Sequence, residues 1–221
     1  LHFFMIIHRC KYKKKNEFQA DSLGYVLLKK TKFKSSEFIE TLKLMNKYDT
    51  IRPEGLHKDI YKKIFNLPNL PFKEDWLQME DFSKYDYNLY QSRFNKDSVS
   101  THPEMVDRIK KMQTLFPELL SSKTEKPTDE FKKLEKSAQY NIVPNLMFFE
   151  EYGVAIYICL YHLQKEEDKP YYTKLLGENF TKIYQARKEY KLNRYLDQID
   201  PKNNSESYIQ FLSFMWNLNL D

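Results

Sequence analysis

Glycine is scarce in this chain, with four glycines among 221 residues. Glycine readily adopts the left-handed backbone conformations that tight turns require, so folds with many turns use it often. All-β folds and loops that wrap around phosphate groups both need such turns, and the sequence contains neither a G-x-G-x-x-G pattern nor a P-loop. The chain is therefore expected to be mainly α-helical.

Apolar residues recur every three or four positions in the N-terminal half, which is the spacing of helices with one buried face. The first predicted helix covers residues 16–31, and the second begins after Ser35 or Ser36. A third is predicted to open at Thr101, because Thr101 and Glu104 fit a capping box, in which the two side chains satisfy backbone N–H groups of the first turn.

Residues 50–100 break the helical pattern. This stretch contains three prolines and many aromatic residues, and its aromatic content predicts packing onto a domain rather than a disordered linker. A polar run at residues 121–127 is the best domain boundary in the sequence. We therefore expect residues 1–120 to form one domain, with the 50–100 stretch as an insertion that could face a substrate, and residues 128–221 to form a second, helical domain.

Four further helices are predicted beyond the polar run, at residues 129–139, 144–164, 170–190 and 205–220. Their lengths and their faces rich in Tyr, Phe and Leu suggest a helical bundle or the stacked helix pairs of helical-repeat proteins. No repeat period is strong enough to identify a particular repeat family. This C-terminal region offers no catalytic pattern.

The charges are numerous but interspersed, with 36 basic and 31 acidic residues and a net charge of +5. Such a distribution predicts a solvated helical surface, so no nucleic-acid partner is expected. The one dense basic run, at residues 11–15, is interpreted as a solvated loop. The two cysteines are far apart in sequence and are typical of free thiols in a reducing compartment, here taken to be the cytoplasm.

The chain begins with Leu1, followed by a short apolar run that resembles the end of a buried helix, so we interpret the chain as the C-terminal part of a longer protein. No basic region precedes that run, which argues against a signal peptide. The longest apolar stretch elsewhere, residues 154–161, is far shorter than the roughly 20 residues of a membrane-spanning helix. We therefore expect no membrane span in this segment.

Two short motifs carry the chemical signal. Glu17 and Asp21 are four residues apart, so on a helix they project from one face. About eighty residues later, His102 follows Thr101, and Arg108 comes six positions after it. A carboxylate pair at this spacing is common on solvated helices, and a lone Thr-His-Pro is usually a helix cap; the combination is what points to a metal-dependent site.

Together these motifs, N-E-F-Q-A-D at residues 16–21 and T-H-P-x-x-x-D-R at residues 101–108, resemble the second half of the gluzincin metallopeptidases of the HtpX and CAAX-prenyl-protease type. The resemblance covers about residues 1–120. It implies a fold that is mainly α, with the helical second half of a zincin-like peptidase domain followed by the C-terminal helices. It also implies a zinc-dependent metalloendopeptidase whose substrate is a peptide or protein.

By the same resemblance, Glu17 would be a zinc ligand and Asp21 would orient a ligand histidine. His102 would be catalytic, stabilising the negative charge on the peptide oxygen, and Arg108 would hold the segment that carries His102. The family's H-E-x-x-H motif, which supplies two histidine ligands and a general base, is absent from all 221 residues. We therefore expect this chain alone to be inactive and to hold zinc weakly.

The runner-up interpretation is a noncatalytic helical interaction module, either a degenerate peptidase or a helical-repeat domain. Oligomeric state and substrate identity have no signal in the sequence. Gly24 lies inside the first predicted helix, where glycine costs about 1 kcal/mol relative to alanine. Its presence predicts the close approach of another backbone, such as the H-E-x-x-H helix, and hence uncovered apolar surface near Gly24.

Overall fold

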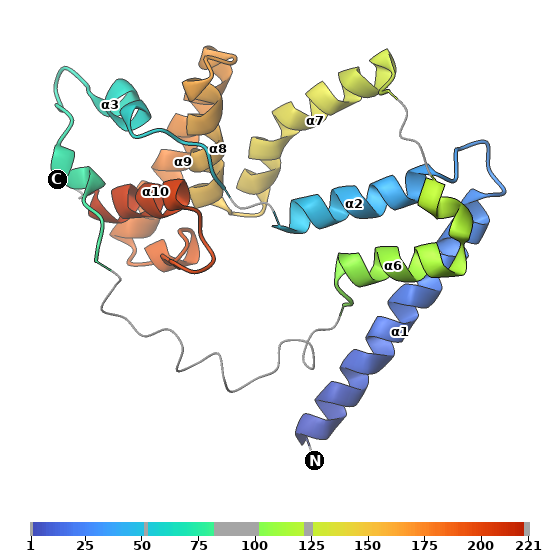
Figure 1. The fold of residues 1–221 in the computed structure, drawn as a ribbon. Coiled ribbons are helices and arrows are strands. Elements are labelled where there is room, and N and C mark those ends of the chain that lie inside the picture. Colours follow the sequence, from blue (N-terminus) through green and yellow to red (C-terminus); the bar gives the residue numbers. More distant parts are fainter. Residues whose placement is uncertain (1, 51–52, 82–101, 122–125, 219–221) are drawn as a thin grey trace. The chain divides into compact units, whose positions relative to one another are not determined.

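A computed structural model describes residues 2–50, 53–81, 102–121 and 126–218 of the chain (Figure 1). The described residues are mainly helical and none of them lies in a β-strand, which confirms the fold class expected from the scarcity of glycine. Within the same ranges, no helix has both the length and the apolar character needed to cross a membrane.

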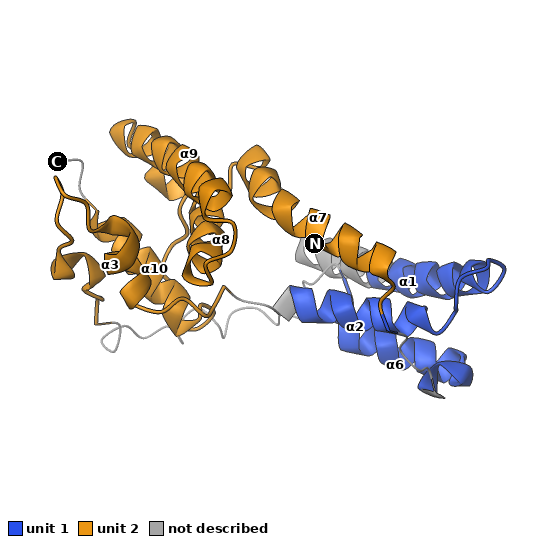
Figure 2. Cartoon of the chain, turned by 90° about the horizontal axis from the view of Figure 1, so that it is seen from above, with its two compact units in different colours: residues 1–51, 85–126 blue, residues 52–84, 127–221 orange. Residues whose placement is uncertain are grey.

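The chain divides into two compact units, shown in different colours in Figure 2. Unit 1 comprises residues 1–51 and 85–126, and unit 2 comprises residues 52–84 and 127–221. The chain passes from one unit to the other after residues 51, 84 and 126, and the last of these breaks falls at the predicted polar run. The first two differ from the expected division, because residues 52–84 group with the C-terminal helices rather than forming an insertion of the N-terminal domain.

Unit 1 is built from α1 (His2–Leu28), α2 (Glu37–Thr50), α6 (Met105–Leu115) and the short 3-10 helix η3 (Pro117–Ser121). Helix α6 packs against both α1 and α2. The ring of Tyr25 lies at the centre, 5.6 Å from the ring of Phe38 and 4.6 Å from that of Phe116. Around it lie the other buried apolar residues of the unit: Ile39, Leu42, Met112 and Leu119.

Two predicted features of unit 1 are corrected. Helix α1 passes through the basic run at residues 11–15, which is therefore not a loop. Helix α6 begins at Met105, and its N-cap is Glu104 with no side-chain hydrogen bond to the helix, so the predicted capping box is wrong. Thr101 itself lies outside the described residues. Because a proline disfavours helical conformation in the residue before it, Pro103 keeps His102 out of the helix.

Unit 2 is centred on α8 (Tyr152–Gln164), which packs against α7 (Asp129–Phe148) and α9 (Lys169–Lys188). Buried residues lie all around α8, so it is a core helix rather than an amphipathic one. The remaining elements of the unit are α3 (Asp59–Phe65), η1 (Glu74–Leu77), η4 (Leu192–Arg194) and α10 (Glu206–Asn217).

The segment at 53–81 contributes directly to the core of unit 2. Ile60 and Tyr61 of α3 are buried in the same apolar cluster as the residues of α8 and α10. The backbone N–H of His57 donates to Gln164 Oε1 at 2.7 Å, which fixes the segment to the end of α8. The aromatic residues of this stretch are thus used for packing within unit 2.

The sequence predicted that one helix would end at residue 139 and a new one would begin at Pro144, and this boundary is wrong. Helix α7 continues through Pro144 to Phe148, although proline cannot donate to the carbonyl four residues earlier. That carbonyl, of Tyr140, instead accepts a hydrogen bond of 2.6 Å from the Tyr171 hydroxyl of α9. The chain turns at Glu150, which has a left-handed φ of 62°. A tertiary hydrogen bond therefore replaces the one that proline removes.

Candidate functional site

The candidate site lies in unit 1, where α1 lies beside the stretch from His102 to Phe116, which contains α6. The two stretches run in the same direction. His102 contacts Glu17, Arg108 contacts Asp21, and Phe116 contacts Tyr25, so successive positions on one segment meet successive positions on the other. The four residues that the sequence singled out (Glu17, Asp21, His102 and Arg108) are brought together in this way, from two stretches about 85 residues apart.

Asp21 and Arg108 form a buried ion pair with two hydrogen bonds. Arg108 Nε donates to Asp21 Oδ2 at 2.8 Å, and Nη2 donates to Oδ1 at 2.6 Å. The two residues are 6% and 9% exposed. These hydrogen bonds to Asp21 raise the pKa of Arg108, so the guanidinium stays charged although it is largely shielded from water. The planar fork of arginine matches both carboxylate oxygens, which fixes the orientation as well as the distance.

Glu17 lies one turn before Asp21 on the same face of α1. Its Oε1 is 3.1 Å from His102 Nδ1, and its Oε2 is 3.5 Å from Arg108 Nη1. The side chain of Glu17 is 30% exposed and that of His102 is 66% exposed. In contrast to the enclosed Asp21, this carboxylate is therefore open to a ligand on one side while Arg108 steadies it on the other.

The donor atoms of these residues determine whether they can hold a metal ion. A catalytic zinc usually has three protein ligands. Among the described residues, no group of three or more His, Cys, Asp or Glu side chains has a geometry that could hold a metal. Both oxygens of Asp21 are occupied by Arg108, which leaves Glu17, beside His102. The described residues thus fit a single carboxylate ligand and not a complete zinc site.

Among the described residues, no backbone closely approaches Gly24. The expected neighbour is an H-E-x-x-H helix, which this sequence does not contain, so the close approach stays a prediction. A Cβ added at Gly24 would meet the side chain of Phe38 at 3.8 Å, an ordinary contact distance. Apolar residues beside it in sequence are nevertheless uncovered: Leu23 is 62% exposed and Leu27 is 53% exposed. They belong to a face of α1 other than the one carrying Glu17.

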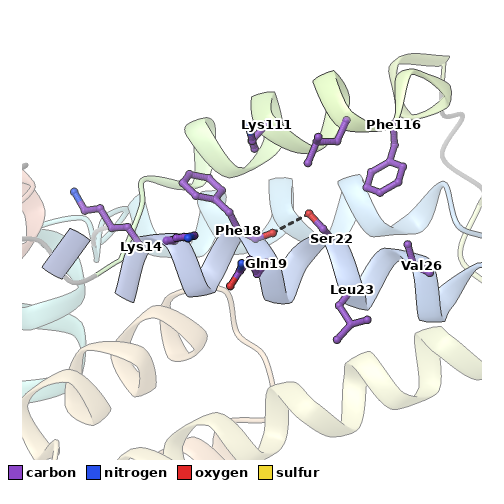
Figure 3. Close-up of a pocket in the computed structure, with 10 residues that line it drawn as sticks. Lys14, Phe18, Gln19, Ser22, Leu23, Val26, Lys111 and Phe116 are labelled. Carbon is purple, nitrogen blue, oxygen red and sulfur yellow. Dashed lines mark hydrogen bonds between the residues drawn. The ribbon is translucent and has the colours of Figure 1, made fainter. Parts of the chain in front are cut away.

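Leu23, but not Leu27, lines an open groove of about 760 Å³ whose other lining residues come from α1 and from α6 with the residue that follows it (Figure 3). Phe18 and Phe116 project between the two helices, whereas Leu23 points away from α6. The charged residues that line the groove are all basic. They are Lys14, Lys15 and Lys111.

A second polar connection ties the end of α1 to η3, and sequence patterns gave no signal for it. The Tyr25 hydroxyl donates to Glu118 Oε1 at 3.1 Å, and Lys29 Nζ lies 3.0 Å from the same oxygen. Glu118's own backbone N–H, followed by the Lys29 ammonium, lowers the pKa of Glu118. The partners are about 90 residues apart, so only the tertiary fold reveals that they meet.

Comparison with known proteins gives one result that bears on this site. The model of Peptidase family M48 matches residues 3–115, more than half of the chain. The matched range contains Glu17, Asp21, His102 and Arg108 and ends with the last residue of α6. No curated protein and no solved structure matches the chain. The chain therefore belongs to peptidase family M48.

Proposed function

We propose that this chain forms the second half of the catalytic site of a zinc metallopeptidase that hydrolyses peptide bonds. Membership of family M48 supports a metallopeptidase-type function. The observation that carries the proposal is the 3.1 Å contact between Glu17 and His102, which are 85 residues apart in sequence. A partly exposed carboxylate and an exposed imidazole meet there beside a buried ion pair.

In this proposal Glu17 supplies the anionic ligand of the zinc. Its carboxylate is accessible, and the neighbouring Arg108 limits how far it can rotate. Supporting groups of this kind orient metal ligands and raise metal affinity. A bound zinc would supply the Lewis acid and the activated water of peptide hydrolysis.

His102 is proposed to touch the substrate rather than the metal. Its side chain is two-thirds exposed and lies just before α6, so a peptide carbonyl can reach it. A donor aimed at the oxygen on which negative charge develops contributes about 3–4 kcal/mol in comparable sites. The Asp21–Arg108 pair would keep the segment carrying His102 at a fixed distance from α1, which is a positioning role.

The remaining ligands are proposed to come from an H-E-x-x-H helix outside these 221 residues, as in peptidases of the HtpX and CAAX-prenyl-protease type. The sequence contains no such motif, and the described residues hold no three-ligand cluster. Under this proposal the present chain provides one of three protein ligands and one substrate-contacting group.

Zinc titration of the 221-residue chain tests this division of the site. Because the chain supplies only one of the three protein ligands, its Kd for zinc in isothermal calorimetry should be micromolar or weaker. Glu17→Gln should abolish that weak binding. Lys43→Met, on an exposed pair in α2, is the matched control. Tight stoichiometric zinc that persists in Glu17→Gln would mean that other residues form the site.

A second candidate function is a noncatalytic interaction module, favoured by the missing H-E-x-x-H and the lack of a three-ligand cluster among the described residues. Glu17 and His102 would then serve only to join α1 to the segment before α6. In that case Glu17→Gln and His102→Gln would lower the melting temperature of the chain by similar amounts. The coding sequence upstream of Leu1 separates the two candidates, since only the peptidase needs an H-E-x-x-H there.

A further inference from the structure

Unit 2 contains an apolar cavity of about 310 Å³ that the proposed peptidase function does not use. The volume is at the lower end of the range for small-molecule sites, which are mostly apolar with a few placed polar groups. Its walls come from the end of α3, the following turn, η1, α9 and the residue after α10. The lining residues are Phe65, Leu67, Leu70, Lys73, Trp76, Phe180 and Leu218.

The turn that forms the rim of this cavity is held by backbone hydrogen bonds. Leu67 and Leu70 each donate their N–H to the carbonyl of the other, at 3.1 Å in both directions. Asn66 Oδ1 accepts from the N–H of Phe72 at 3.1 Å, which closes the turn onto the next segment. Both leucines remain about half exposed, so the rim presents apolar side chains to solvent at a fixed position.

The inner walls are aromatic and packed against one another. The ring of Phe65 meets that of Phe180 edge-on at 5.4 Å, and the ring of Trp76 meets that of Phe72 in the same manner at 5.4 Å. Phe65 and Trp76 also contact Phe214, which is fully buried in the core. The cavity walls are therefore anchored to the core and preformed, which reduces the ordering cost of binding.

Lys73 is the only charged residue among those lining the cavity. Its Nζ lies 6.0 Å from the centre of the Trp76 ring. Among the described residues, Lys73 forms no ion pair with a carboxylate. Neighbouring Lys62 differs, because its Nζ pairs with Glu74 at 3.2 Å. An unneutralised cation at an apolar cavity favours a ligand that combines an apolar body with one negative charge.

We propose that this cavity binds an apolar carboxylic acid of about the size of decanoate. The carboxylate contacts Lys73 and the aliphatic chain lies against Phe65, Trp76 and Phe180. The site is independent of the proposed peptidase function, because all seven lining residues belong to unit 2 and none belongs to the group around Glu17.

Tryptophan fluorescence provides a direct test, since the chain has two tryptophans and one of them lines the cavity. In a Trp216→Phe background, Trp76 is the sole reporter. Decanoate is expected to change its emission with a Kd of about 10–100 μM at low salt, a strength typical of small ligands. Decylamine and decanol have the same chain, and each should bind at least tenfold more weakly.

Three substitutions, one of them a control, separate binding in the cavity from nonspecific uptake of an amphiphile. Lys73→Met keeps the aliphatic stem and should weaken decanoate binding at least tenfold while leaving decanol unchanged, whereas Lys62→Met should leave both unchanged. Leu70→Gln changes an exposed rim residue, so the fold should survive while decanoate and decanol both weaken. Equal binding of decanoate and decylamine, unaltered decanoate binding by Lys73→Met, or no emission change up to 1 mM decanoate would each overturn the proposal.

Discussion

Arg108 donates two hydrogen bonds to the two carboxylate oxygens of Asp21, at 2.8 and 2.6 Å, across 87 residues of sequence. Both residues are almost fully buried, and Glu17 and His102 meet on the more exposed side of the same contact. This ion pair holds α6 against α1, and it thereby sets the positions of Glu17 and His102 in the candidate site.

Asp21→Asn should destabilise unit 1 by about 3–5 kcal/mol, because it leaves the buried guanidinium of Arg108 without its full counter-charge. The free energy of unfolding in urea measures this effect. The double variant Asp21→Leu/Arg108→Met should recover most of the loss, since it removes both charges together. Lys43→Met is the control and should change stability by less than about 1 kcal/mol, because its pair is exposed. An Asp21→Asn chain as stable as the parent would show that the pair is not needed for the fold.

Two helical glycines of unit 2 should respond in opposite ways to alanine. Gly177 lies within α9, and apart from its own helix no atom of the described residues would lie within 4 Å of an added Cβ, so Gly177→Ala should stabilise the unit by up to about 1 kcal/mol. Gly153 is the second residue of α8, and an added Cβ there would lie 3.0 Å from Leu196 Cδ1 and 3.1 Å from the Tyr195 carbonyl oxygen. Gly153→Ala should therefore be destabilising. Thermal unfolding of both variants tests the packing of α8, and a stabilising Gly153→Ala would contradict it.

Two buried tyrosine hydroxyls form a second matched pair. The Tyr61 hydroxyl has no hydrogen-bond partner within the described part of the chain, whereas the Tyr208 hydroxyl donates to Asp197 Oδ2 at 2.6 Å. Removing an unsatisfied buried hydroxyl relieves its desolvation cost, so Tyr61→Phe should stabilise by about 1 kcal/mol or more. Tyr208→Phe should destabilise by about 1–3 kcal/mol, because it removes a bond to a charged group. If chemical denaturation shows Tyr61→Phe to be the more damaging change, the Tyr61 hydroxyl has a partner after all.

Unit 2 should lose stability at alkaline pH. Burial raises the pKa of Cys159 to about 12 and raises the pKa of both Tyr61 and Tyr208 above the ordinary tyrosine value of 10.0. These groups stay protonated in the folded unit but ionise in the unfolded chain above about pH 9–10. Stability is therefore complete below pH 9 and falls as pH rises, by about 1.4 kcal/mol per pH unit for each group.

Urea unfolding between pH 8 and pH 11 measures that loss of stability. Tyr61→Phe removes one of the three ionising groups, so the free energy of unfolding of this variant should fall by about 1.4 kcal/mol less per pH unit. A stability that stays level up to pH 11 would mean that these side chains are solvated. Tyrosinate absorbance in the same titration shows whether ionisation coincides with unfolding.

The sequence predicted the helices well because helical periodicity is local. Residues 37–50 and 105–115 are helical close to where the apolar spacing placed them. Boundaries set by tertiary contacts were missed. Nothing near Pro144 in sequence indicates that Tyr171, on another helix, satisfies the carbonyl of Tyr140. The membership of residues 52–84 in unit 2 was missed for the same reason.

The candidate site was predictable as a set of residues but not as a geometry. The motifs identified Glu17, Asp21, His102 and Arg108 together. They did not indicate that Arg108 occupies both oxygens of Asp21, which leaves Glu17 as the accessible carboxylate. That distinction depends on burial, and burial is a property of the packed helices rather than of spacing in the sequence.

The most direct test of the proposed function is the effect of Glu17→Gln and His102→Phe in the longer protein that the proposal requires, in which an H-E-x-x-H helix accompanies this chain. Zinc content by elemental analysis and peptide hydrolysis are measured together. Glu17→Gln should lose the zinc, whereas His102→Phe should keep it and lower kcat about 10²–10³-fold with little change in KM, because its contact strengthens only in the transition state. A Glu17→Gln enzyme that retains both its zinc and its activity would contradict the assignment of Glu17 as a ligand, and with it the central claim.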